Sequence, residues 1–403
     1  MGCFQLSTNP IELLFYGLSL LQAFRGVQLG QILWREWGEF KLEPLTPRKA
    51  WLGEQAAFFL AIPPSVAVHE LFHALPIWAF GGRIARCGYG FYWGFVQADR
   101  FFLAEEQWFI SLAGTLGSLL FGLTLWLVLR RHRSSSLRYF GLRSLRMQLY
   151  FSLIFYPLFS AFTFIGDWRI IYNFERTPQL SGLAVVLHGV GLALMWYGQR
   201  QGWFDLPQAE SAAQLAQLRQ TEAAAAARPR DLASQLQHVK ALRQAGLLSQ
   251  AQREGQKLIR AFPDVGDGYV ELALVQLTNQ AHFPRAVLEH LQQALARPIG
   301  QPDYLVIAHL LLGQHNLNLE RAEKALNHLS YAIETAQNIP DQSEANRMRL
   351  AQAYYLRAMV HRRQNEMAPA RRDIDKAIEL ARGSGRDELH EHFQTFKQSL
   401  PPA

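Results

Sequence analysis

Hydrophobic and polar positions divide the chain near residue 201. Before that point long apolar runs dominate, and after it Gln, Ala, Arg and Glu interrupt every apolar stretch. A chain of 403 residues is also longer than one compact core usually holds. The pattern predicts an all-α protein with a polytopic transmembrane helical domain over 1–200 and a soluble helical repeat (solenoid) domain over 233–400. An Ala- and Gln-rich linker over 201–232 joins the two.

Several apolar segments are long enough to cross a bilayer, which takes about 20 mostly apolar residues in a helix. The segment 11–33 is interrupted by Glu12 and Arg25, so we expect it either to span the membrane or to lie at its surface. The sequence therefore predicts four or five spans. The stronger segments are 52–80, 107–129, 148–172 and the shorter 181–198.

The loop between the second and third of these stronger segments is rich in arginine and has no acidic residue. By the positive-inside rule this loop faces the cytoplasm. The segment 148–172 then crosses outward and 181–198 returns, which leaves the repeat domain in the cytoplasm too. We expect a multi-pass protein of a bacterial inner membrane or a similar organellar membrane. The net charge is +7, and this loop carries much of the excess, which favours membrane topology over nucleic-acid binding. Its arginines are Arg130, Arg131, Arg133, Arg138, Arg143 and Arg146.

The first strong apolar segment contains two histidines four residues apart, His69 and His73. Side chains at this spacing share one helix face, so both can bind one zinc ion while Glu70 reaches a water on that ion and acts as general base. Ionisable residues inside an apolar span are costly and are functional by default. The alternative is a polar group packed against other helices. Only two cysteines are present, which excludes a Cys-rich metal site.

A catalytic zinc site takes three protein ligands and leaves one position for water, so a third ligand must come from another segment. Asp167 is the first carboxylate after Glu106 and lies near the end of the apolar segment 148–172. Because one span separates this segment from the motif, the two are expected to run parallel and to place like ends at like depth. Asp167 is the predicted third ligand, although it could instead pair with Arg169.

Two other residues are candidate ligands from their types and positions. Glu175 is the second choice after Asp167, and His188 is expected to be a hydrogen-bonded packing residue. Pro63 and Pro64 before the motif, and Pro76 after it, predict a broken helix, which membranes tolerate where a cavity or protein satisfies the backbone.

The motif and its surroundings resemble the site-2 protease family of intramembrane zinc metallopeptidases over about residues 50–175. The segment 69–74 and the glycines that follow resemble the family's motif helix and turn, 111–120 its second core helix, and Gly166-Asp167 its third. The resemblance implies that His69, His73 and Asp167 bind zinc and that Glu70 is catalytic. It also implies that Gly114 contributes to substrate binding and that the substrate is a membrane-spanning protein helix.

The chain departs from the family pattern at four positions. The family usually has Gly where Phe72 stands, Pro and Asn where Thr115 and Ser118 stand, and Gly where Trp168 stands. Family members commonly hold the metal near the cytoplasmic face, whereas the arginine loop places this end of the motif helix on the other side.

The polar half carries a recurring trio of a small or β-branched residue, a large aliphatic residue and an alanine. This spacing resembles the tetratricopeptide repeat, although the trios lie further apart than that repeat's period of about 34 residues. An earlier helix pair around Leu242 and Leu258 is a candidate first repeat. Stacked repeats present an extended surface, so we expect a protein or peptide partner on them. The trios are Val287, Leu291 and Ala294; Ala325, Leu329 and Ala332; and Ala370, Ile374 and Ala377.

Two functions follow from these patterns. The first is an intramembrane zinc endopeptidase whose repeats recruit a substrate or partner. The alternative is a non-enzymatic membrane scaffold, an inactive protease relative, that acts through its repeats. A transporter or channel is less favoured, because the spans show no charged or glycine-broken pathway outside the motif.

Overall fold

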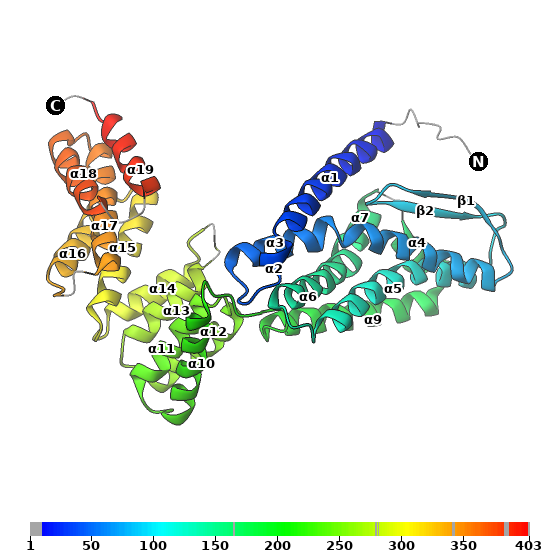
Figure 1. Cartoon of the computed structure of the whole chain (residues 1–403), viewed down its shortest axis with the longest axis horizontal. Helices are drawn as coiled ribbons and strands as arrows, with labels where there is room; N and C mark the ends of the chain where they lie inside the picture. The colour runs from blue at the N-terminus through cyan, green and yellow to red at the C-terminus, as the bar shows by residue number, and fades with distance from the viewer. Residues whose placement is uncertain are drawn as a thin grey trace. The chain divides into compact units, whose positions relative to one another are not determined.

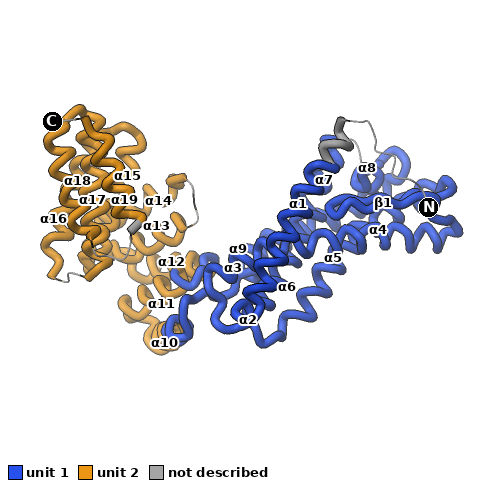
Figure 2. Tube along the Cα trace, turned by 45° about the horizontal axis from the view of Figure 1, so that its top comes forward, with its two compact units in different colours: residues 1–217, 244–249 blue, residues 218–243, 250–403 orange. Residues whose placement is uncertain are grey.

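The computed structural model describes residues 10–163, 166–278, 280, 282–340, 343–382 and 387–401. Helices make up most of this part of the chain, as the all-α prediction required (Figure 1). The chain forms two compact units, coloured separately in Figure 2. The first comprises residues 1–217 and 244–249, and the second comprises residues 218–243 and 250–403.

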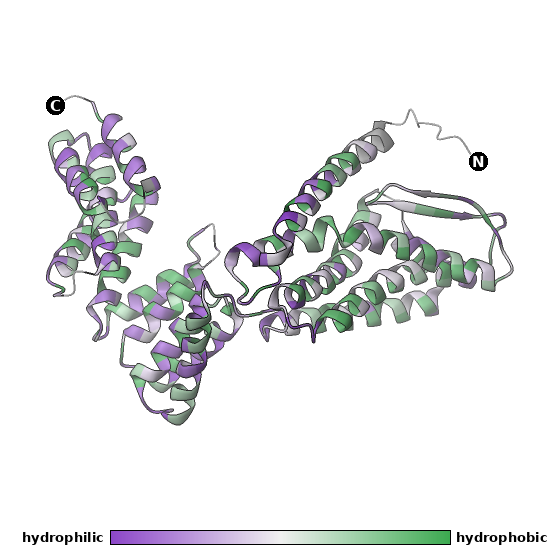
Figure 3. Ribbon diagram, viewed as in Figure 1, coloured by the Kyte–Doolittle hydropathy of each residue, from purple (hydrophilic) through white to green (hydrophobic). Residues whose placement is uncertain are grey.

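The first unit is built from long helices and one two-stranded hairpin. In Figure 3 its helices α4, α5 and α9 are dominated by hydrophobic residues, whereas the helices of the second unit mix both kinds. The helices are α1 (Pro10–Arg35), α2 (Trp37–Phe40), α3 (Pro47–Phe59), α4 (Ile62–Ala79), α5 (Ala104–Leu129), α6 (Ser135–Tyr150), the π-helix η1 (Phe151–Phe155), α7 (Tyr156–Thr163), α8 (Asp167–Ile171) and α9 (Pro178–Arg200).

Three helical stretches among the described residues are long and apolar enough to cross a membrane. They are Pro47–Ala79, Ala104–Leu129 and Pro178–Arg200. Large apolar side chains remain exposed along them, as on Leu116 and Val186, which are 50% and 61% exposed. These stretches correspond to three of the four stronger predicted spans. The weaker segment 11–33 lies within α1, which is not among the three.

The segment 148–172 is not the single helix that the sequence predicted. Helix α6 ends at Tyr150, the π-helix η1 follows, and α7 ends at Thr163. Pro157 has no amide hydrogen to donate to the helix ladder, and Gly166 has a φ of 112°, a backbone conformation that side chains rarely adopt. Asp167 therefore begins the separate short helix α8.

The motif segment is broken before the histidines, where Pro63 and Pro64 predicted a break. Pro76 does not break it, because this proline lies inside the helix that carries the histidines. Helix α3 ends at Phe59, and α4 begins at Ile62 with Pro63 and Pro64 in its first turn, where proline's missing amide hydrogen costs nothing. After α4 the chain forms an antiparallel hairpin of strands β1 (Ile84–Tyr89) and β2 (Gly94–Ala98). The hydropathy pattern did not predict these strands.

The second unit is an array of antiparallel helix pairs, and all nine trio residues lie in the second helix of their pairs. Each of these residues is 0% exposed, because each stands where two helices approach closely. The predicted close-packing trios are thus confirmed. The pairs are α11 (Leu232–Gln244) with α12 (Leu248–Ala261), α13 (Asp267–Leu277) with α14 (Arg285–Leu295), α15 (Pro302–Asn318) with α16 (Ala322–Gln337), and α17 (Glu344–Arg363) with α18 (Met367–Ala381), followed by α19 (Asp387–Gln398).

The helix pair before the first trio also belongs to the array. Leu242 on α11 and Leu258 on α12 are both buried, as expected for a first repeat that lacks the trio. The Ala-rich part of the predicted linker forms helix α10 (Ala212–Ala227), and the boundary between the two compact units falls within it, after residue 217.

Candidate metal centre

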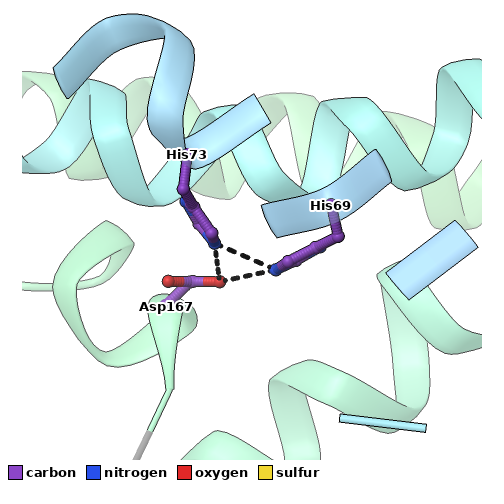
Figure 4. A group of neighbouring side chains, drawn as sticks. All are labelled: His69, His73 and Asp167. Atoms are coloured by element: carbon purple, nitrogen blue, oxygen red, sulfur yellow. Dashed lines mark hydrogen bonds and ion pairs between the residues drawn. The ribbon is translucent and has the colours of Figure 1, made fainter. Parts of the chain in front are cut away.

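Two histidines of α4 and the first residue of α8 point at one another (Figure 4). The Nε2 atoms of His69 and His73 are 3.0 Å apart, and each lies 3.1 Å from the same oxygen, Oδ2 of Asp167. All three side chains are largely shielded from solvent, with exposed fractions between 9% and 16%. The structure therefore brings the three predicted ligand side chains together in one place.

The hydrogen bonds on the far side of each imidazole determine which nitrogen faces the cluster. Nδ1 of His73 lies 2.7 Å from the carbonyl oxygen of Ile110, which can only accept, so His73 carries its proton on Nδ1. Nδ1 of His69 lies 3.1 Å from the hydroxyl of Ser118. Both partners are on α5. With its proton on Nδ1, His73 turns the lone pair of Nε2 toward the cluster, as metal-binding histidines do, and the Ser118 hydroxyl can accept a hydrogen bond from Nδ1 of His69 in the same way.

The geometry of the cluster fits a small cation. Two imidazole Nε2 atoms and a carboxylate oxygen converge within 3.1 Å of one another, an arrangement that a shared positive charge such as a bound cation stabilises. Zinc holds such ligands at about 2.0–2.2 Å, which separates neighbouring ligands of a tetrahedral site by about 3.3–3.6 Å. The observed separations of 3.0 and 3.1 Å are within a few tenths of an ångström of that spacing. Among the described residues, these three form the one group of at least three such side chains.

Glu70 follows the first histidine and is close enough to interact electrostatically with all three ligands. Its Oε2 atom is buried and has no hydrogen-bond partner within the described part of the chain. The hairpin covers this side chain, because a Cβ at Gly94 of β2 would lie 2.6 Å from Cγ of Glu70. Glu70 thus brings a buried carboxylate oxygen beside His69, His73 and Asp167, and a carboxylate within hydrogen-bond reach of a water can act as its general base.

Helix α5 approaches the motif helix closely at two glycines. A Cβ at Gly114 would lie 2.4 Å from Nε2 of His73 and 2.6 Å from Nε2 of His69. A Cβ at Gly117 would lie 2.6 Å from the Phe72 ring. Gly114, predicted as a substrate-binding residue, is therefore in contact with the ligands themselves. Phe72, which replaces the glycine usual in the family, packs on the space that Gly117 leaves.

The start of α8 is held by contacts with α5, α7 and α9. The indole of Trp168 is buried, packs near Trp108 of α5 in one apolar cluster, and lies 4.6 Å from the ring of His188. Asp167 itself is held from α7, since its Oδ2 accepts a hydrogen bond of 2.9 Å from the Tyr156 hydroxyl. Packing on both sides of Asp167 thus determines where its carboxylate lies.

The other residues considered as ligands lie outside the cluster. Glu175 is exposed and is not part of the metal-binding group. His188 has Nε2 2.6 Å from the carbonyl oxygen of Leu153 in the π-helix, and Nδ1 in a hydrogen bond with the Tyr172 hydroxyl. His188 is therefore a hydrogen-bonded packing residue, as predicted.

The sequence analysis missed two side chains that contact the ligands, Tyr156 and Ser118. Tyr156 is a hydroxyl-bearing residue within an apolar segment, 11 residues before Asp167, and this setting is the one signal that could have indicated it. Ser118 was noted only as a departure from the family pattern. Its position about two turns along α5 from Ile110 places both partners of the histidines on one helix.

No protein-family model and no curated protein matches the chain in sequence. Two solved structures align with part of it. One, described as the crystal structure of MamA protein, aligns over 46% of this chain and 87% of its own, with 17% identity and a TM-score of 0.30. The other, YrrB, described as a TPR protein with an unusual peptide-binding site, aligns over 43% of this chain and 97% of its own, with 15% identity and a TM-score of 0.28.

Similarity at this level carries no argument about the arrangement or the ligands of this chain. The assignment of tetratricopeptide-like repeats rests instead on the helix pairs and on the nine fully buried trio residues.

Proposed function

We propose that the first unit is an intramembrane zinc endopeptidase of the site-2 protease type. The observation that carries the proposal is the convergence of His69 Nε2, His73 Nε2 and Asp167 Oδ2 within 3.1 Å of one another. Three protein ligands leave a fourth tetrahedral position for water, which distinguishes a catalytic zinc site from a structural one.

Each residue of the cluster has a role in this proposal. His69, His73 and Asp167 would bind the ion, which when bound supplies Lewis acidity and lowers the pKa of a water beside it toward about 7. Glu70 accepts a proton from the attacking water on its unpartnered Oε2 and passes it to the nitrogen of the leaving amine. The scissile peptide carbonyl binds on the open side of the cluster.

The substrate class follows from the apolar setting. The motif helix α4 and its neighbour α5 belong to stretches that are long and apolar enough to span a bilayer. A cluster on such helices meets peptide bonds of segments that are themselves in or near the membrane. The proposed substrate is a membrane-spanning protein, bound beside Gly114, whose helix unwinds locally before cleavage.

The second unit binds a protein or peptide partner in this proposal. Stacked helix pairs present an extended surface that is not used in their own core. The acid-free stretch from Arg130 to Arg146 runs from the end of α5 into α6, where Arg138, Arg143 and Arg146 lie. By the positive-inside rule we expect this stretch, and the repeat unit, to face the cytoplasm. Protease accessibility of the repeats in sealed vesicles of known orientation tests the side that they face.

The decisive experiment measures zinc and proteolysis in parallel. Purified full-length protein is expected to hold one zinc ion, Asp167→Ala to lose it, and Glu70→Gln to retain it. Cells expressing Glu70→Gln are expected to accumulate membrane proteins that wild type cleaves. Wild-type protein without zinc contradicts the metal centre. Wild-type protein with zinc, and with a membrane proteome identical to that of Glu70→Gln, supports the scaffold alternative, in which deleting the repeats abolishes function.

A further inference from the structure

Tyr156 stands at the start of α7, directly after the π-helix, and its hydroxyl reaches the metal-binding cluster. Its oxygen lies 2.9 Å from Oδ2 of Asp167, which is the oxygen that faces both histidines. The backbone amide of Asp167 donates a second hydrogen bond of 3.2 Å to the same hydroxyl. The tyrosine ring also lies 5.7 Å from the imidazole of His69, edge to face.

The two hydrogen bonds fix the direction of the tyrosine proton. Because the amide of Asp167 can only donate, the hydroxyl oxygen accepts from it and its own hydrogen is free to donate to Oδ2. A carboxylate oxygen has two lone pairs, so Oδ2 can accept from Tyr156 with one and face the two Nε2 atoms with the other. Oδ2 is therefore oriented toward the two histidines by contacts within the protein.

The glycine before Asp167 permits the close approach of Tyr156 to that residue. Gly166 has a φ of 112°, and a Cβ there would lie 3.2 Å from the Tyr156 hydroxyl oxygen and 2.6 Å from Oγ of Ser160. The missing side chain leaves room for the tyrosine to contact the residue that follows. The break in the segment 148–172 thus places Tyr156 and Asp167, 11 residues apart, in direct contact.

We infer that Tyr156 is a positioning residue for the metal centre, which holds Asp167 as a ligand through Oδ2 alone. This inference rests on the proposed zinc site. With Oδ2 anchored, the carboxylate cannot rotate to bring both oxygens onto the ion, and the fourth position remains open for water. Hydrogen-bond partners of metal ligands typically contribute 10–100-fold to metal affinity.

The test compares Tyr156→Phe with Tyr150→Phe in the full-length protein. Tyr150→Phe also removes a hydroxyl with a hydrogen bond of 2.9 Å, here to Oε1 of Gln199, which is not one of the proposed ligands. Zinc affinity is measured by competition with a chelator, and ligand geometry by the visible absorption of the cobalt-substituted protein. Tyr156→Phe is expected to weaken zinc binding by about 10–100-fold and to weaken the cobalt bands, because a freed carboxylate adds a fifth ligand atom. Tyr150→Phe is expected to match wild type in both.

The outcomes separate this inference from the proposed function. If wild type and Tyr156→Phe bind zinc equally and give the same cobalt spectrum, Tyr156 does not position Asp167. That result would leave the proposed metal centre uncontradicted. If wild type binds neither ion, the metal centre and this inference are both wrong. A loss shared by Tyr150→Phe also overturns the inference, since it then reflects general destabilisation.

Discussion

Gly114 of α5 lies directly against the imidazole of His73 on α4. A methyl group at this glycine would come 2.4 Å from both Cε1 and Nε2 of the histidine, far inside the contact distance of real side chains. Nδ1 of the same imidazole is held by the Ile110 carbonyl, so the ring cannot simply turn away. The absence of a side chain at position 114 is therefore a requirement of the observed arrangement of the two histidines and Asp167.

We expect Gly114→Ala to lower zinc affinity by at least about tenfold, because the histidine Nε2 atoms must move away from Asp167. Zinc content after dialysis against a chelator measures the effect. Gly189→Ala on α9 is the matched control, since its Cβ would meet nothing within 4 Å. Equal zinc retention by the two variants would contradict this prediction, because α4 and α5 could then move apart without weakening zinc binding.

Ser118→Ala removes the partner of Nδ1 of His69, which lies 3.1 Å away. The imidazole loses the contact that orients it, so zinc affinity should fall by about 10–100-fold while the helices remain folded. Chelator competition measures the fall. Ser111→Ala on the same helix is the control, because its buried hydroxyl has no hydrogen-bond partner among the described residues. A similar loss in Ser111→Ala would point to packing and not to the histidine.

The repeat unit contains a fully buried carboxylate, Glu271 of α13, held from the helices on either side. Its Oε1 accepts a hydrogen bond of 2.6 Å from Nε of Arg243 on α11, and its Oε2 accepts one of 2.8 Å from Tyr304 on α15. Removing one partner of a buried ion pair leaves an uncompensated charge, which typically costs about 3–5 kcal/mol. Arg243→Met is therefore expected to destabilise this unit by about that amount.

Urea unfolding of the full-length protein, followed by hydrogen exchange of peptides from α13 and α15, measures this loss. The double variant Arg243→Met with Glu271→Leu should recover much of it, because no unpaired charge remains. Arg285→Met is the control, since Arg285 pairs with Glu289 at the exposed surface and such pairs contribute little. A double variant as unstable as Arg243→Met would show that the loss comes from packing.

Acid is expected to destabilise the repeat unit at a histidine pair. Nδ1 of His309 on α15 lies 3.0 Å from Nδ1 of His328 on α16. Burial, and then the like charge of His328, lower the pKa of His309 from 6.5 to about 4. Between these values the unfolded chain binds the proton more readily than the folded one. The stability that neutral His309 contributes to the folded repeat unit is therefore complete above pH 6.5 and is lost as the pH falls toward about 4.

Hydrogen exchange of peptides from α15 and α16, compared at pH 7 and pH 5 after correction for the intrinsic rate, tests this prediction. His328→Gln should reduce the acid sensitivity, because the like charge is removed and only burial lowers the pKa of His309. His290→Gln is the control, since the His290 ring contacts only the carbonyl oxygen of Ala286 on its own helix among the hydrogen bonds described. An acid response unchanged by His328→Gln would contradict the assignment to this pair.

Local patterns in the sequence were sufficient to predict features that depend only on neighbouring positions along one helix. The spacing of His69 and His73 places both on one face of α4, because a helix turns once in 3.6 residues. The trio spacing likewise predicted which residues of α14, α16 and α18 are fully buried. These relationships need no knowledge of distant segments.

The position of Asp167 in space could not be predicted from local patterns alone. The sequence singled out this residue as the third ligand, on the expectation that it ends a continuous span parallel to the motif helix. The structure brings it to the histidines by another route, through a π-helix, Pro157 and the unusual backbone of Gly166. A helix break of this kind depends on contacts between segments, which a hydropathy profile does not contain.

The sequence by itself thus determined the residue types of the site, the two unlike halves and the faces of their helices. Only the tertiary structure decided that one carboxylate oxygen meets both Nε2 atoms, that Gly114 makes room for them, and that Tyr156 holds that oxygen. The physical reason is that hydrogen bonds and close packing between α4, α5, α7 and α8 join residues far apart in the chain. Their distances are set by the fold as a whole.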